Sequence, residues 1–192
     1  MTAMAQPQST PGPWSVTTRV IVYSAIGAAM YAAAGYFSFF TQIPGTEGVY
    51  LRPAYGILTF FGFAFGPVVG LFTGLVGNAL ADLLTGTGFA SWHWSVANGL
   101  AGLVAGLCAV LFARGMVSTG TRAALSIVAA EIGTAVGFLF IWIELIIQPE
   151  LGAETILWAE YVPAVVSNAI FAAILTPILV LAWEPFSERL GR

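Results

Sequence analysis

The chain has 192 residues, of which 58% are hydrophobic and only 8% are charged, with a net charge of −3. This excludes a soluble domain, because a water-facing surface carries roughly 25–35% charged residues. The small net charge and the absence of lysine argue against nucleic acid as a partner. A mean hydropathy of +0.89 indicates instead that most of the surface faces a lipid bilayer.

The two ends of the chain differ from the apolar middle. Residues 1–16 are rich in Pro, Ser, Thr and Gln and predict a disordered N-terminal tail. The next apolar run is longer than a signal-peptide core and lacks a basic leader, so we interpret it as a membrane helix. Residues 17–185 then form the membrane domain, and residues 186–192 a cytoplasmic C-terminal tail.

Six apolar segments follow one another, and about 30 Å of hydrocarbon takes roughly 20 helical residues to cross. They lie at about residues 18–40, 52–65, 67–85, 94–113, 123–147 and 161–183. The second is short for a span, which indicates little tilt or an end inside the protein. Pro67 suits the first turn of the third helix, and Pro177 is expected to kink the last. The sequence predicts an all-α integral membrane protein with six transmembrane helices.

The placement of arginine predicts how these helices are oriented. Five of the six arginines fall near the N-terminus, between the fourth and fifth helices, or near the C-terminus. They are Arg19, Arg114, Arg122, Arg189 and Arg192. With six spans these regions share one side of the membrane, which the positive-inside rule makes cytoplasmic. Both termini are therefore predicted to be cytoplasmic, and only Arg52 falls on the outer side.

Small residues recur every four positions on three helices, a pattern that lets helix backbones approach closely in lipid. For the glycines on the third and fourth helices we predict packing within the monomer. These glycines are Gly66, Gly70, Gly74, Gly102 and Gly106. On the first helix, Ala25, Ala29 and Ala33 form a nearly continuous alanine surface, for which contact with another subunit is a fair alternative.

Polar side chains within apolar helices usually face the bundle interior or a cavity, because lipid does not solvate them. Asn78 and Asp82 share one face of the third helix, and Trp94 and Asn98 share one face of the fourth. Together such groups predict a pocket that opens to the outer side. The alternative for each asparagine is an interhelical hydrogen bond. The predicted pocket residues are Arg52, Asn78, Asp82, Trp92, His93, Trp94, Asn98, Glu160 and Asn168.

Catalysis has little support in the sequence. His93 and Asp82 are two candidate metal ligands without a third, and no nucleophile–base spacing or phosphate-binding loop is present. We therefore predict no metal, no cofactor and no enzymatic activity, so that uphill transport needs an ion gradient or a partner ATPase. Glu131 lies about 12 Å from the cytoplasmic end of the fifth helix, at 1.5 Å per residue. Its carboxyl group either forms a hydrogen bond with a neighbour such as Thr134 or takes part in proton coupling. Cys108, in an apolar run, is expected to be a small buried hydrophobe.

Several short motifs occur in a fixed order along the chain. They are Ala25-Ile-Gly-Ala-Ala-Met-Tyr31, Leu51-Arg-Pro-Ala54, Phe65-Gly-Pro-Val-Val-Gly70, Gly77-Asn-Ala-Leu-Ala-Asp82, Trp92-His-Trp-Ser-Val-Ala-Asn-Gly99 and Val162-Pro-Ala-Val-Val-Ser-Asn168. From the first helix to the last, this succession resembles the substrate-binding S components of energy-coupling factor (ECF) transporters, in their riboflavin-transporter-like branch.

The resemblance implies a six-helix S component that captures a vitamin or similar micronutrient from outside. It implies as partners a T component and two cytosolic ATPases, on which the loaded S component topples to release its cargo. In that family an Ala-x-x-x-Ala stripe on the first helix contacts the T component. Ala25–Ala29 matches the stripe, and Ala28–Ala32 and Ala29–Ala33 have the same spacing. The family's pocket lies in the outer half under a lid from the loop after the first helix. Arg52, Asn78, Asp82, Trp92, Trp94, Asn98 and Asn168 match these places.

We therefore predict the substrate-capture subunit of an ATP-driven micronutrient importer in a prokaryotic cell membrane. Trp92 and Trp94 would stack on a flat heteroaromatic ligand, while Arg52 with Glu47 would gate access. The acidic outer side favours neutral or cationic compounds, such as thiamine-like ones. The alternatives are a self-sufficient proton-coupled carrier or channel, a membrane enzyme that uses His93, and a structural scaffold.

Overall fold

The computed structural model describes residues 12–46, 48–113, 115 and 118–189. Most of the predicted N-terminal tail and the last three residues lie outside this part of the chain. The main helices are α1 (Thr18–Ser38), α2 (Tyr55–Phe65), α3 (Pro67–Thr85), α4 (Trp92–Phe112), α5 (Thr119–Gly137) and α8 (Val162–Arg189). Between α5 and α8 lie the 3₁₀ helix η1 (Phe138–Ile143), the short helices α6 (Glu144–Ile147) and α7 (Gly152–Thr155), and the π-helix η2 (Ile156–Tyr161).

The predicted all-α class is confirmed. Within the described ranges the structure has helices and one isolated bridge between Gln42 and Tyr50, but no strand. Five helical segments are long and apolar enough to cross a membrane, and α2 is a shorter apolar helix of 11 residues. The five segments are Thr18–Ser38, Pro67–Thr85, Trp92–Phe112, Thr119–Ile147 and Gly152–Ser187.

Three helix boundaries differ from the predicted ones, and a proline and a helix-capping serine account for two of them. α2 begins at Tyr55 because the residue before a proline is disfavoured in helical conformation, which leaves Arg52 in the preceding loop. α5 begins at Thr119 because the Ser118 hydroxyl accepts a hydrogen bond from the backbone N–H of Thr121. α8 continues through Pro177 to Arg189, past the predicted end at residue 183.

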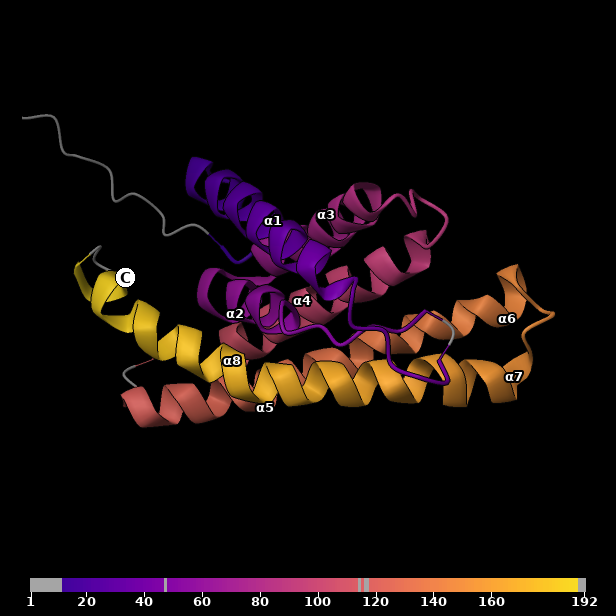
Figure 1. Cartoon of the computed structure of the whole chain (residues 1–192). Coiled ribbons are helices and arrows are strands. Elements are labelled where there is room, and N and C mark those ends of the chain that lie inside the picture. The colour runs from indigo at the N-terminus through magenta and orange to yellow at the C-terminus, as the bar shows by residue number, and fades with distance from the viewer. Residues whose placement is uncertain (1–11, 47, 114, 116–117, 190–192) are drawn as a thin grey trace, which may run out of the picture.

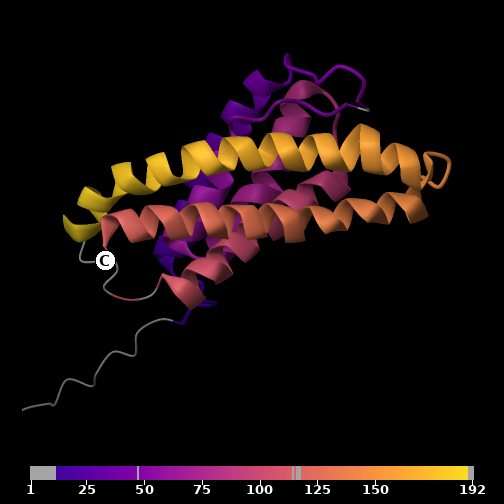
Figure 2. The same cartoon turned by 90° about the horizontal axis from the view of Figure 1, so that it is seen from below.

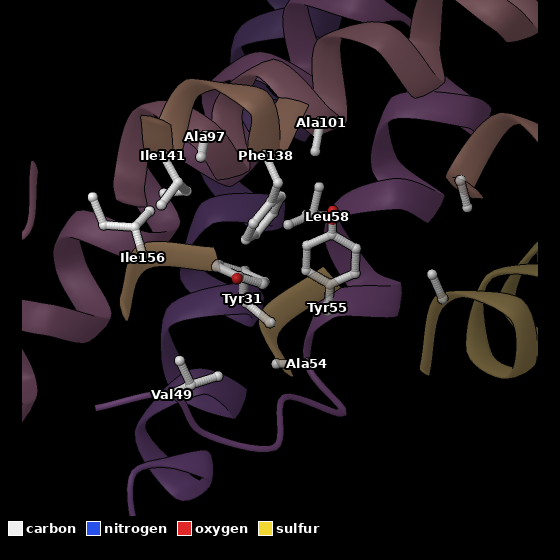
Figure 3. Packing of buried hydrophobic residues seen from close by; sticks show 13 residues of the cluster. Tyr31, Val49, Ala54, Tyr55, Leu58, Ala97, Ala101, Phe138, Ile141 and Ile156 are labelled. Carbon is white, nitrogen blue, oxygen red and sulfur yellow. The ribbon is translucent and has the colours of Figure 1, made fainter. Parts of the chain in front are cut away.

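The helices form two groups that meet side by side. Helices α5 and α8 run alongside each other as a long hairpin whose α6–α7 end reaches beyond the other helices (Figures 1 and 2). In the other group α3 packs against both α1 and α4, while α4 also packs on α5 and α2 packs on α8. A cluster of buried side chains joins the two groups, in which Tyr31 and Tyr55 meet Phe138 and Ile141 from η1 (Figure 3).

The glycines of α3 and α4 pack against each other, which confirms the predicted packing within the monomer. A Cβ atom on Gly70 would lie 2.2 Å from the Gly102 carbonyl oxygen, and one on Gly74 would lie 2.2 Å from the Asn98 carbonyl oxygen. Gly66 has a different role, since its φ of +104° forms the sharp junction between α2 and α3. Because glycine has no side chain, the backbones of α3 and α4 lie in direct contact along this stretch.

The alanines of α1 divide between its two faces. Ala25, Ala29 and Ala33 are exposed on one face of α1. Ala28 and Ala32, on another face of the helix, are buried with exposed fractions of 2% and 4%. Of the three spacings that the sequence allowed, Ala25–Ala29 and Ala29–Ala33 lie on an exposed surface.

Candidate functional site

A cavity of about 190 Å³ lies at one end of the bundle, between α1, α3, α4, α8 and the loop formed by residues 39–54. The apolar cluster of Figure 3 forms part of its wall through Tyr31, Val49 and Phe138. The loop contributes Phe39 and Tyr50 to the lining, and their rings stack with centroids 5.2 Å apart. The loop therefore adds aromatic side chains to the wall of the cavity.

Five of the nine predicted pocket residues line this cavity. They are Arg52, Asn78, Asp82, Trp94 and Asn168. The other four do not line it. Trp92 is 43% exposed on the outside of α4, while His93, Asn98 and Glu160 are buried in the surrounding protein. Glu47, the predicted gating partner of Arg52, lies outside the described residues.

Asn78 is the centre of the polar side of the cavity. Its Oδ1 atom accepts a hydrogen bond from Arg52 Nη1 at 2.6 Å, and its Nδ2 group donates to Asp82 Oδ2 at 2.9 Å. The same Nδ2 group donates to Ser95 Oγ on α4 at 3.0 Å. A single amide thus holds a guanidinium and a carboxylate next to each other, and both keep further donors and acceptors for a ligand.

Asn98 is engaged by the protein itself. Its Oδ1 atom accepts a hydrogen bond from the Tyr31 hydroxyl at 2.9 Å, which joins α4 to α1. Its Nδ2 group donates to the Trp94 carbonyl oxygen at 2.8 Å and to Asn78 Oδ1 at 3.4 Å. For this residue the geometry matches the interhelical hydrogen bond that the sequence left as an alternative.

Asn168 is the polar group that α8 contributes. Its side chain is 3% exposed, lines the cavity, and makes no hydrogen bond within the described part of the chain. A buried amide without a protein partner costs free energy unless water or a ligand satisfies it. Asn168 therefore joins Arg52 and Asp82 in the lining of the cavity as a third group with unused hydrogen-bonding capacity.

Next to Trp94 lies a buried polar cluster of His93 and Glu160, both predicted pocket residues, with Glu144, which was not among the predicted site residues. Glu144 Oε1 pairs with His93 Nε2 and accepts a hydrogen bond from Trp94 Nε1 at 3.2 Å. The carboxyl of Glu160 lies within hydrogen-bonding reach of Glu144. The sequence does contain a sign of this cluster, because Glu144 is the one carboxylate in the apolar run of residues 138–147, and a carboxylate in such a run usually has a buried partner.

The described residues contain no group of three or more His, Cys, Asp or Glu side chains that could hold a metal. The lining of the cavity combines a guanidinium, a carboxylate and amides with aromatic rings. An apolar pocket with a few placed polar groups is the usual form of a site for a small solute. Within an apolar helical bundle, this geometry defines a solute-binding membrane protein.

Comparison with known proteins identifies the family. Residues 15–184 match the family described as ECF-type riboflavin transporter, S component, and the chain belongs to it. The chain is 30% identical over 181 residues to a UPF0397 protein from Streptococcus gordonii, an alignment that covers 91% of this chain and 92% of that protein. It is 37% identical over 91 residues to a UPF0397 protein from Streptococcus pneumoniae, which covers 47% of this chain and 48% of that protein.

The resemblance noted from the sequence motifs is thereby confirmed. The chain is the substrate-binding subunit of an ECF transporter and a multi-pass protein of the bacterial plasma membrane. Its family consists of transporter components rather than enzymes.

Proposed function

We propose that the cavity captures a heteroaromatic micronutrient, a vitamin or vitamin precursor, from the outside of the cell. The observation that carries this proposal is the pairing of Arg52 and Asp82 through Asn78 in a cavity that the ring of Trp94 also lines. A flat ligand would stack on the indole, while its polar edge would meet the charged pair.

The unused hydrogen-bonding groups define the edge that such a ligand would present. Arg52 donates, Asp82 accepts, and Asn168 does either, so the ligand would carry acceptors and donors side by side. Riboflavin, which the family description names, has such an edge on its pyrimidine ring. The aminopyrimidine of thiamine has one as well, and the cationic thiazolium ring of thiamine would suit the carboxylate of Asp82.

Six spans and cytoplasmic termini remain part of this proposal, with α2 as the sixth and shortest span. In Figure 1 α1 begins and α8 ends at the same end of the molecule, away from the α6–α7 end. Arg19, Arg122 and Arg189 lie in the first or last turns of α1, α5 and α8. Arg114 and Arg192 lie outside the described residues. By the positive-inside rule, the cavity and the loop that lines it would then open to the outer face.

Delivery of the solute would require a T component and two cytosolic ATPases. The exposed alanines Ala25, Ala29 and Ala33 offer a flat surface on α1, on which another helix could approach closely. A self-sufficient proton-coupled carrier is the second candidate, because Glu131 Oε1 is buried without a hydrogen-bond partner among the described residues. Uptake that stops when the ATPase genes are deleted supports the first proposal, and uptake that continues supports the second.

The first test is mass spectrometry of small molecules that remain bound to the detergent-purified protein. We expect a stoichiometric heteroaromatic compound in the wild type and its loss in Trp94→Ala. Trp158→Ala is the matched control, because Trp158 is an exposed indole on η2 that does not line the cavity. A compound retained equally by both variants would refute the assignment of Trp94 to the binding site.

A further inference from the structure

Glu144 is a carboxylate in an unusually buried position, at the start of α6 and only 1% exposed. Both of its neighbours in α4 contact the same oxygen atom, His93 through Nε2 and Trp94 through Nε1. A buried carboxylate is stable only when it is paired or hydrogen-bonded, and these two contacts supply that requirement. Glu144 therefore ties the first turn of α4 to the end of the α5–α8 hairpin.

The contact with Trp94 has a consequence for the cavity. Indole carries a single N–H donor and no acceptor, and Glu144 takes that donor. Phe138 packs edge-to-face on the same indole, with centroids 6.1 Å apart and an interplanar angle of 73°. Phe138 and Glu144 belong to one continuous segment, η1 followed by α6, so one segment fixes the indole by two contacts.

The geometry of η1 places Glu144 where it makes this contact. A 3₁₀ helix has three residues per turn, against 3.6 in an α-helix. Over the six residues of η1 this rotates every later side chain by roughly 120° relative to a continuous α-helix. Without that rotation Glu144 would point to a different face of the hairpin.

We infer that Glu144 is a positioning residue of the solute site: it fixes the Trp94 ring as a wall of the cavity and withdraws the indole N–H from ligand recognition. This inference rests on the proposed function, since a fixed wall matters only where a solute binds. It adds a selectivity rule, because a ligand would use the face of Trp94 and take its hydrogen bonds from Arg52, Asp82 and Asn168.

The direct test is the indole N–H signal of Trp94 in a ¹H–¹⁵N spectrum of the full chain in detergent. The chain has six tryptophans, and Trp94→Phe identifies the signal by its disappearance. We expect the signal to move upfield in Glu144→Gln, which keeps the side-chain volume, and further in Glu144→Leu. Glu154→Gln is the control, because Glu154 is an exposed carboxylate at the same end of the hairpin. A Trp94 signal that stays in place in both Glu144 variants overturns the inference.

A second measurement separates this inference from the proposed function. Riboflavin and thiamine are each titrated into the wild type, Trp94→Ala and Glu144→Gln. Loss of binding in Trp94→Ala with about tenfold weaker binding in Glu144→Gln supports both, since tenfold corresponds to about 1.4 kcal/mol, close to the lower limit of roughly 1.5 kcal/mol for a hydrogen bond to a charged group.

The other outcomes are also decisive. Wild-type affinity in Glu144→Gln, with binding lost in Trp94→Ala, overturns the positioning role and leaves the proposed site intact. Wild-type affinity in Trp94→Ala overturns the proposed site. If neither compound binds the wild type, the proposal fails for these two ligands, and the indole signal alone decides whether Glu144 fixes the ring.

Discussion

Replacing Gly70 with alanine tests the helix contact that holds the cavity together. The new Cβ atom would lie 2.2 Å from the carbonyl oxygen of Gly102 and 2.7 Å from the Cα atom of Gly62. Both are backbone atoms, which cannot move aside as the end of a flexible side chain would. Ordinary contact begins near 3.4 Å, so α3 and α4 would have to separate by about 1.2 Å.

The expected cost follows from this displacement. Overpacking a close contact typically costs about 1–3 kcal/mol, and we expect the upper part of that range because the clash is with backbone. For a chain of this size, such a loss lowers the melting temperature by roughly 4–10 °C. The separation would also stretch the Asn78–Ser95 hydrogen bond, now 3.0 Å, so ligand binding should weaken as well.

The assay is thermal unfolding of the purified protein in detergent, followed by circular dichroism. Gly120→Ala is the matched control, because a Cβ atom there meets nothing within 4 Å and alanine favours the helix by up to about 1 kcal/mol. We expect Gly120→Ala to melt at or slightly above the wild-type temperature. If Gly70→Ala also melts at the wild-type temperature, the close contact between α3 and α4 is wrong.

The remaining predictions concern the charged pair, the partner surface and a buried hydroxyl pair. Arg52→Gln should weaken binding of the co-purifying ligand by at least tenfold without lowering the melting temperature, and unchanged retention of the compound would remove Arg52 from the site. Ala29→Leu should spare ligand binding but prevent co-purification with a T component, and normal assembly would count against the alanine surface. Thr59→Val should destabilise the fold by about 1–3 kcal/mol, because it leaves the buried hydroxyl of Thr176, 2.6 Å away, with one partner fewer. The double variant with Thr176→Val should recover most of that loss in a thermal melt, and no recovery would argue against the pairing.

The sequence by itself determined the class of protein and much of the polar side of the cavity. Charge content and apolar runs specify a helical membrane protein, because lipid accepts few charges and apolar runs of roughly 20 residues match the length of a membrane-spanning helix, whose backbone is satisfied internally. The spacing of Asn78 and Asp82 placed both on one face of α3, and both line the cavity. These are local properties, which depend on one helix and its solvent.

Helix geometry alone separates Trp92 from Trp94. Trp92 and Trp94 are two residues apart, which on an α-helix places them roughly 200° apart, so both cannot face one cavity. Trp94 lines the cavity, and Trp92 is exposed on the other side of α4.

The tertiary structure decided which polar groups remain available to a ligand. Asn98 looks equivalent to Asn78 in the sequence, yet the Tyr31 hydroxyl and the Trp94 carbonyl engage it. Glu144 is separated from Trp94 by 50 residues, and their contact depends on the 3₁₀ turns of η1 and on the packing of the hairpin against α4. Neither property is visible from residue types, because hydrogen-bond partners far apart in the chain are fixed only when whole helices pack together.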